Sequence, residues 1–256
     1  MKHEKFKTLP SKLSTISFTN NLVHNLFPFI DGGRPKSISR RKLEKQLKAL
    51  LKTTPTVERY AQQELAKKFM LSLDSIKEQL LTDATFIEGN DPATTCVEEV
   101  VMTYPGFLAI AIYRLANRLK TLGVPLIPRI MTEYAHSQTG IDIHPGASID
   151  SPFFIDHGTG IVIGESAVIG KRVKLYQGVT IGALSVSKEL ARVKRHPTIE
   201  DDVVIYAGAT ILGGKTTIGM RTVVGGNVWL TESVPPFSIV QHDNKVRITT
   251  RDYSLS

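Results

Sequence analysis

The sequence predicts an α+β fold, in which an N-terminal α-helical domain is followed by a left-handed parallel β-helix. Apolar residues recur at helical spacing as far as about residue 138. Beyond that point they recur every six residues, the period of a β-helix built from hexapeptide repeats. No apolar run approaches the roughly 18 residues that a membrane-spanning helix needs, so we expect no membrane partner.

The composition is typical of a soluble globular protein. The 256 residues are 41% hydrophobic and 22% charged, which suffices for a sizeable core. Cys96 is the single cysteine, which excludes an intramolecular disulfide and a four-cysteine zinc site. No apolar segment follows the lysines near the N-terminus, so we expect no secretory signal and a cytoplasmic setting.

The positive charge is concentrated at the N-terminus. Residues 1–52 contain 12 Lys and Arg against 3 acidic residues, a net charge of +9, whereas the whole chain carries +8. The body is therefore nearly neutral, and nucleic acid is not an expected partner. Residues 1–38 have weak periodicity and contain Gly32-Gly33, so we expect an irregular, solvated basic arm. A phosphate-binding or membrane-surface patch is the alternative.

Residues 39–138 are predicted to form the helical domain. The expected helices cover residues 40–52, 57–81, 107–122 and 127–137. Pro55 separates the first two, and Gly123 ends the third. Asp91-Pro92 is typical of the N-cap and first position of a further helix. Tyr104-Pro105-Gly106 interrupts the helical pattern.

Residues 139–240 are predicted to form the β-helix. The apolar positions that follow the six-residue period are Ile143, Ile149, Ile155 and Ile161, then Ile163, Ile169, Leu175 and Ile181, then Ile199, Ile205 and Ile211, then Ile218, Val224 and Leu230. Three such strands make one triangular coil of about 18 residues, with one apolar side chain per strand pointing inward. The register slips by two residues after Ile161 and by one after Ile211. Residues 185–196 are charged and lack corner glycines, so we expect a loop extruded from one corner; residues 241–256 form a C-terminal tail.

Several polar residues are not needed to pack a β-helix and are candidates for chemistry. These are Asp142, Asp156, His157, Arg195 and His196. Asp142 and His157 are 15 residues apart, close to one coil, so they could face each other on adjacent rungs. A carboxylate beside an imidazole orients the ring and makes it a usable general base near neutral pH.

A zinc site is the competing interpretation of the histidines. His136 and His144 could join His157 in a three-histidine set, as in carbonic anhydrases of this fold type. Their spacings match no multiple of the rung, so we expect no metal. Cys96 has no evident base beside it and is expected to be a structural thiol.

Four segments together resemble the serine O-acetyltransferases, in particular a bacterial subgroup. They are Ile141–Pro145 (IDIHP), Ile155–Glu165 (IDHGTGIVIGE), Tyr176–Ser185 (YQGVTIGALS) and Arg195–Ile199 (RHPTI). The likeness covers roughly residues 91–237. The hexapeptides alone indicate only an acyltransferase superfamily, whereas the Asp-His-Gly-Thr-Gly and Arg-His-Pro pieces are highly specific.

The resemblance implies transfer of an acetyl group from acetyl-CoA to the hydroxyl of L-serine, a step towards cysteine. It implies that His157 is the general base and that Asp142 orients it. Arg195 and His196 would bind serine, with the planar guanidinium facing the carboxylate. The remaining implied contacts are Asp91, Asp156 and Glu165 for serine, and Gly182, Ala207 and Gly225 for acetyl-CoA. No permanently bound cofactor is implied.

The resemblance also implies an assembly. A groove between neighbouring β-helices would hold acetyl-CoA, so a homotrimer or a dimer of trimers is expected. Many family members end in isoleucine, which inserts into a sulfhydrylase partner; this chain ends in Leu255-Ser256, which argues against a stable cysteine synthase complex. Two alternatives to serine acetylation stay open: another hydroxyl acceptor such as homoserine or a sugar, and a non-catalytic scaffold.

Overall fold

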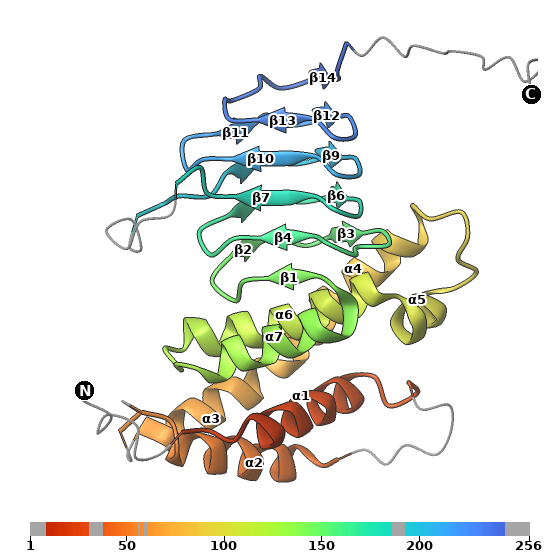
Figure 1. Cartoon of the computed structure of the whole chain (residues 1–256). Coiled ribbons are helices and arrows are strands. Elements are labelled where there is room, and N and C mark those ends of the chain that lie inside the picture. Colours follow the sequence, from red (N-terminus) through yellow and green to blue (C-terminus); the bar gives the residue numbers. More distant parts are fainter. Residues whose placement is uncertain (1–8, 31–37, 56, 59–60, 186–192, 244–256) are drawn as a thin grey trace, which may run out of the picture.

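A computed structural model describes residues 9–30, 38–55, 57–58, 61–185 and 193–243. In this part of the chain, helices lie at one end of a column of short strands (Figure 1). The helices are α1 (Lys12–Leu26), α2 (Arg40–Lys52), α3 (Ala61–Leu71), α4 (Leu73–Glu88), α5 (Val97–Thr103), α6 (Pro105–Thr121) and α7 (Ile127–Thr139). The expectations for α2, α6 and α7 are confirmed within two residues.

Two expectations for the helical domain are wrong. The helix expected over residues 57–81 is two helices, which break at Ser72, where the hydroxyl donates to the Phe69 carbonyl oxygen at 2.7 Å. Such a side-chain bond competes with helix continuation. Asp91-Pro92 does not begin a helix, because the Asp91 carboxylate accepts a hydrogen bond from the Ala93 backbone N–H and closes a turn. The next helix, α5, begins at Val97.

The expectation of an irregular arm is wrong for residues 12–26, which form α1. The Ser11 hydroxyl accepts a hydrogen bond from the Ser14 N–H and caps the helix. Phe18, Leu22 and Leu26 are buried, and so is Thr19, whose hydroxyl donates to the carbonyl one turn earlier. Local bonds of this kind allow threonines to complete a buried stripe that hydropathy alone does not reveal. Residues 1–8 and 31–37 of the expected arm lie outside the described residues.

The β-helix is confirmed: three parallel sheets form the faces of a triangular prism. The sheet orders are β1-β4-β7-β10-β13, β2-β5-β8-β11 and β3-β6-β9-β12-β14. The strands are β1 (Asp142–Ile143), β2 (Ser148–Ile149), β3 (Phe153–Ile155), β4 (Val162–Ile163), β5 (Val168–Ile169), β6 (Val173–Leu175), β7 (Thr180–Gly182), β8 (Thr198–Ile199), β9 (Val204–Ile205), β10 (Thr210–Leu212), β11 (Thr217–Ile218), β12 (Val223–Val224), β13 (Trp229–Leu230) and β14 (Ile239–Val240). The inward residue of nearly every strand is buried, as the six-residue period predicts.

The strand register locates the places where the repeat is interrupted. Val162 and Thr180 are neighbours in adjacent coils, so this coil has the ideal 18 residues. Asp142 pairs with Val162, which makes the first coil two residues longer, and the extra residues lie between β3 and β4. Thr180 pairs with Thr210, and the twelve extra residues lie between β7 and β8. The expected loop 185–196 is this insertion, although residues 186–192 lie outside the described part, as does most of the expected tail.

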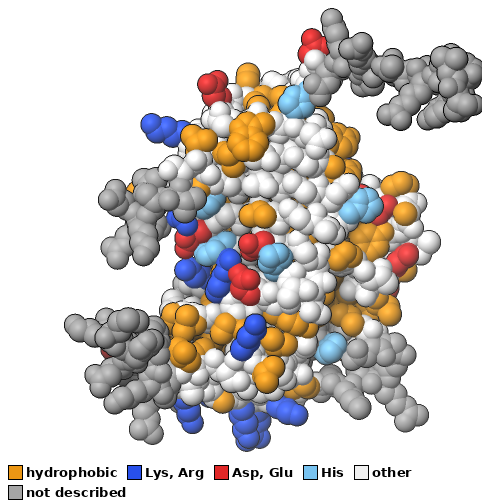
Figure 2. Space-filling view, in the orientation of Figure 1, with side chains coloured by type: hydrophobic (Ala, Val, Ile, Leu, Met, Phe, Trp, Pro, Cys, Tyr) orange, Lys and Arg blue, Asp and Glu red, His pale blue; other side chains and the backbone are white. Residues whose placement is uncertain are grey.

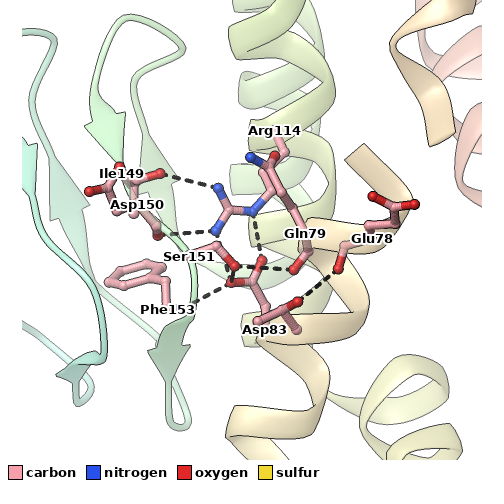
Figure 3. A network of polar contacts seen from close by, with 9 residues as sticks. Glu78, Gln79, Asp83, Arg114, Ile149, Asp150, Ser151 and Phe153 are labelled. Carbon is pink, nitrogen blue, oxygen red and sulfur yellow. Dashed lines mark hydrogen bonds and ion pairs between the residues drawn. The ribbon is translucent and has the colours of Figure 1, made fainter. Parts of the chain in front are cut away.

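A buried ion pair joins the helices to the first coil (Figure 3). The Arg114 guanidinium on α6 donates to both carboxylate oxygens of Asp83 on α4, at 2.6 and 2.8 Å. Asp83 also accepts from the Ser151 hydroxyl and the Phe153 N–H, while Arg114 donates to the Ile149 carbonyl oxygen. Two helices and two strands are therefore fixed by one network.

In the described part of the chain, no single helix is both long and apolar enough to cross a membrane. The bent pair Val97–Thr103 and Pro105–Thr121 passes the same length and composition test only when its two helices are taken together.

Candidate active site

The candidate residues occupy two corners of the prism, at opposite edges of the sheet that contains β1, β4 and β7. We call Asp156–Gly160 and the adjoining Asp91 and Tyr104 the His157 corner. Glu165, Ser166, Arg195 and His196 form the Arg195 corner. Figure 2 shows charged and histidine side chains gathered at one edge of this face, and a histidine beside an acidic side chain at the opposite edge.

His157 lies on the two-residue insertion between β3 and β4. Its backbone is in the left-handed region (φ 57°), and Gly158 follows at φ 84°. A Cβ at Gly158 would lie 2.4 Å from Ile141 Cδ1, so only glycine fits there. This turn presents the imidazole outward, with 69% of the side chain exposed. Its Nδ1 lies 3.3 Å from Asp156 Oδ1, which orients the ring and leaves Nε2 for a reacting group.

Asp91 is placed at the same corner by the turn before α5. Its Oδ2 accepts a hydrogen bond from the Tyr104 hydroxyl at 2.7 Å, and its Oδ1 accepts from the Ala93 N–H at 2.8 Å. These bonds, together with the nearby His157 ring, hold the pKa of Asp91 below its usual range. The hydrogen bond between Tyr104 and Asp91 also raises the pKa of the Tyr104 hydroxyl to about 12. Asp91 is therefore a fixed carboxylate that can receive a cationic group.

The expected pairing of Asp142 with His157 is not formed within this chain. The first coil is 20 residues long, so Asp142 lies beside Val162, and the carboxylate next to His157 is Asp156. Asp142 Oδ1 lies 3.7 Å from an Arg129 guanidinium nitrogen, and it is buried without a hydrogen-bond donor in the described part of the chain. A spacing of 15 residues brings two side chains near one corner, but does not make them neighbours.

The Arg195 corner and the adjoining Lys120 together carry a positive charge, whereas the carboxylates Asp91 and Asp156 lie at the His157 corner. Arg195 donates to Glu165 Oε2 at 2.7 Å, and Lys120 Nζ lies 3.7 Å from Glu165 Oε1. The hydrogen bond from Arg195 is the main reason that the pKa of Glu165 is lowered. With Glu165 ionised beside two cations, the corner keeps a net positive charge that suits a carboxylate.

Ser166 fixes Arg195 and His196 on the prism, where the chain returns to the β-helix. Its hydroxyl accepts hydrogen bonds from the backbone N–H groups of Arg195 and His196, at 2.9 and 3.1 Å. The Ser166 N–H donates to His196 Nδ1 at 3.1 Å, so the neutral ring carries its proton on Nε2. Burial, followed by the Arg195 charge, lowers the pKa of His196. The ring lies over Gly164, where a Cβ would come within 1.9 Å of it. His196 is therefore a neutral hydrogen-bond donor near pH 7.

His144 lies near Glu165 and Arg195. Its Nδ1 accepts from the Gly146 N–H at 3.0 Å, and burial lowers its pKa to about 4. His136 lies elsewhere, 3.9 Å from Glu133 on α7. Within the described ranges, no three His, Cys, Asp or Glu side chains lie close enough to hold a metal ion.

The residues implied for acetyl-CoA divide between the same two edges. Gly182 ends β7 on the Arg195 side, whereas Ala207 and Gly225 lie on the His157 side. Sequence reasoning missed Tyr104 and Ser166. Tyr104 carried a signal only as a break between helices. Ser166 lies 30 residues before His196, the length of the coil that contains the loop.

No family model matches the chain. Curated relatives do: a plasmid-encoded serine acetyltransferase of Synechococcus elongatus is 52% identical over 192 residues, which is 73% of this chain and 60% of that protein. The serine acetyltransferase of Bacillus subtilis is 40% identical over 177 residues, or 66% of this chain and 79% of that protein. The match therefore spans less than two thirds of the cyanobacterial relative.

A solved structure agrees over more of the chain. Serine acetyltransferase 1 of Entamoeba histolytica, crystallised in complex with L-cysteine, is 36% identical with a TM-score of 0.75. The alignment covers 89% of this chain and 86% of that one, so it includes both the helices and the β-helix.

Proposed function

Because the chain belongs to the serine acetyltransferase family, we propose that it transfers the acetyl group of acetyl-CoA to the hydroxyl of L-serine. The observation that carries this proposal is the His157 corner, where an exposed imidazole lies beside Asp156 and near Asp91. An exposed base flanked by fixed carboxylates suits an acceptor that has both a hydroxyl and an ammonium group. A sugar has no cationic group for these carboxylates to bind.

In the proposed reaction His157 is the general base. Its Nε2 takes the proton from the serine hydroxyl as the oxygen attacks the thioester carbon. When the C–S bond breaks, the imidazolium returns this proton to the CoA sulfur. The products are O-acetyl-L-serine and CoA, and no metal is required because the thioester carbon is already electrophilic. A positioned base contributes about 10²- to 10⁴-fold to such a step.

The remaining candidates bind and orient. Asp91 and Asp156 receive the serine ammonium, while Arg195 and His196 bind its carboxylate, with Glu165 holding the guanidinium in place. Asp142 stays in the proposed site as the residue that stabilises the protonated His157. Asp142 Oδ1 has the Arg129 guanidinium at 3.7 Å but no hydrogen-bond donor among the described residues, and the protonated His157 of a neighbouring chain would supply one.

We further propose that the site is completed between chains of a trimer. The ammonium-binding and carboxylate-binding groups lie at opposite edges of one sheet, so the His157 corner of one protomer would face the Arg195 corner of the next. The outward residues of this sheet include Val162 and Trp229, which are 38% and 63% exposed, as expected of a surface that another subunit covers. Acetyl-CoA would lie in the same groove, against Gly182 of one protomer and Ala207 and Gly225 of the other.

The decisive experiment is CoA release from acetyl-CoA by the purified protein, with L-serine, homoserine and a sugar as separate acceptors. We expect release with L-serine and a loss of at least about 100-fold in kcat for His157→Ala. Release that persists in the variant would show that His157 is not the base. Release only with homoserine or the sugar would reassign the acceptor, and no release with any acceptor would favour a scaffold.

A further inference from the structure

A polar cavity lies between the helices and the first coil, away from both corners of the proposed site. Its volume is about 670 Å³, within the range of small-molecule sites. It is lined by residues of α4, of α6 and of the segment around β2: Ser72, Ser75, Ile76, Gln79, Tyr113, Arg114, Asn117, Arg118, Thr121, Gly146, Ala147, Ser148 and Ile149. This lining contains two arginines and no acidic residue.

The two arginines, one helical turn apart on α6, are in different states. Arg114 is satisfied by Asp83 and by backbone carbonyl oxygens (Figure 3). Arg118 Nε is buried and has no hydrogen-bond partner in the described part of the chain. Arg118 also forms no ion pair with any described residue. A buried N–H without a partner costs free energy, and an anion held by the half-buried Arg118 side chain would recover it.

The neighbouring polar groups fit the same class of ligand. Tyr113 and Asn117 donate to backbone carbonyl oxygens of residues 145–147 and so form a rigid wall. Among the described residues, the side chains of Gln79 and Ser148 engage no protein partner and supply further donors to the cavity. A guanidinium flanked by an amide and a hydroxyl is a set of donors for an oxyanion.

We propose that this cavity binds a small molecule through an oxyanion group, a phosphate or a carboxylate, held by Arg118 with Gln79 and Ser148. The site lies beyond the proposed serine and acetyl-CoA contacts, yet one wall adjoins them. A Cβ at Gly146 would lie 2.9 Å from Glu165 Cγ, so this lining residue packs directly against the Glu165–Arg195 pair. A ligand there can therefore influence serine binding.

The test is equilibrium dialysis of the full chain against radiolabelled inorganic phosphate and, separately, radiolabelled malonate, at constant ionic strength. We expect saturable binding of at least one anion and affinity at least about tenfold weaker in Arg118→Met, because a hydrogen bond to a charged group is lost. Arg41→Met, the same change at an exposed position on α2, should bind like the wild type. Binding of phosphate alone identifies a phosphate ligand, and binding of malonate alone a carboxylate.

A second variant covers the case in which Arg118→Met does not fold. Ser148→Leu places an apolar side chain in the cavity from β2, whose residue 148 points outward. Ser148→Leu should likewise weaken anion binding by at least about tenfold. No saturable binding of either anion to the wild type overturns the proposal. So does binding that is equal in the wild type and the variants, because the anion would then occupy another site, such as the phosphate contacts of acetyl-CoA.

Discussion

Tyr104 fixes the carboxylate that the helical domain contributes to the proposed ammonium site. Its hydroxyl donates to Asp91 Oδ2 and fixes the carboxylate next to His157. In Tyr104→Phe the pKa of Asp91 rises, because its main stabilising hydrogen bond is lost. We expect KM for L-serine to rise about three- to tenfold with little change in kcat, since the bond acts on binding.

The pH profile separates this positioning role from a general loss of structure. At the most acidic end of the profile, where Asp91 itself takes up a proton, the loss of kcat/KM for serine should begin at higher pH in Tyr104→Phe, because the pKa of Asp91 is raised. Tyr134→Phe, on α7, removes the same atom away from Asp91 and should leave the profile unchanged. An unchanged KM and acid limb in Tyr104→Phe would contradict the role assigned to this hydroxyl.

Because His144 is partly buried, it should make the free energy of unfolding depend on pH in the acid range. Its pKa is about 4 in the folded chain, against a reference near 6.5. Between these values the unfolded chain binds a proton that the folded chain does not, so stability falls as the pH is lowered from about 6.5 towards 4. In His144→Gln this contribution disappears, and the urea midpoint should fall less between pH 7 and pH 5. His24→Gln, on α1, is the control. A slope equal to that of the wild type would show that His144 does not carry the effect.

At the scale of elements, the seam between helices and β-helix depends on Asp83, whose carboxylate accepts four hydrogen bonds from three residues: Arg114, Ser151 and Phe153. Asp83→Ala leaves Arg114 charged and buried, and should lower the free energy of unfolding by about 3–5 kcal/mol. Asp74→Ala, on the same helix as Asp83, breaks an exposed ion pair with Arg40 of α2 and should have far less effect. Urea unfolding at pH 7 measures both. The double variant Asp83→Leu with Arg114→Met should regain much of the loss, because no buried charge is left unpaired; equal losses in all three would argue against the network.

Most of the elements could be predicted from local patterns, and the exceptions have identifiable causes. Each strand of the β-helix presents one inward residue, such as Ile163 or Ile181, so the six-residue period alone predicts the coils. Helix α1 was missed because buried Thr15 and Thr19 interrupt its apolar stripe. The break at Ser72 rests on one hydroxyl whose bond has no signature in hydropathy. Short-range periodicity reports burial, whereas a single side-chain hydrogen bond decides where an element ends.

The site residues that could be predicted from the sequence lie where the six-residue period is interrupted. His157 lies between Ile155 and the two-residue slip predicted after Ile161, and Arg195 lies at the end of the twelve-residue insertion, so both occur where packing does not explain the sequence. The side chains that contact these site residues could not be predicted. Asp156 replaces Asp142 beside His157, and Ser166 holds His196, because these contacts depend on the length of each coil and on which corner it turns at.

For the whole molecule, the separation of the His157 and Arg195 corners predicts how inactive chains can complement each other. His157→Ala and Arg195→Ala each disable one corner, so each homotrimer should have little activity at low serine. In mixed trimers, a groove is intact when the intact His157 corner of one chain faces the intact Arg195 corner of the next. A trimer with two chains of one variant and one chain of the other has this arrangement in one of its three grooves, so about a third of wild-type activity should return in the mixed trimers.

Co-expression of the two variants with different affinity tags, followed by purification on both tags, isolates the mixed trimers. Serine-dependent CoA release is then compared with that of the two homotrimers mixed without exchange. Recovery only after co-assembly would place the two corners in one shared groove. If both corners instead served a site within one chain, every protomer would remain defective in one of them, and co-assembly would restore nothing, because neither variant contains an intact pair.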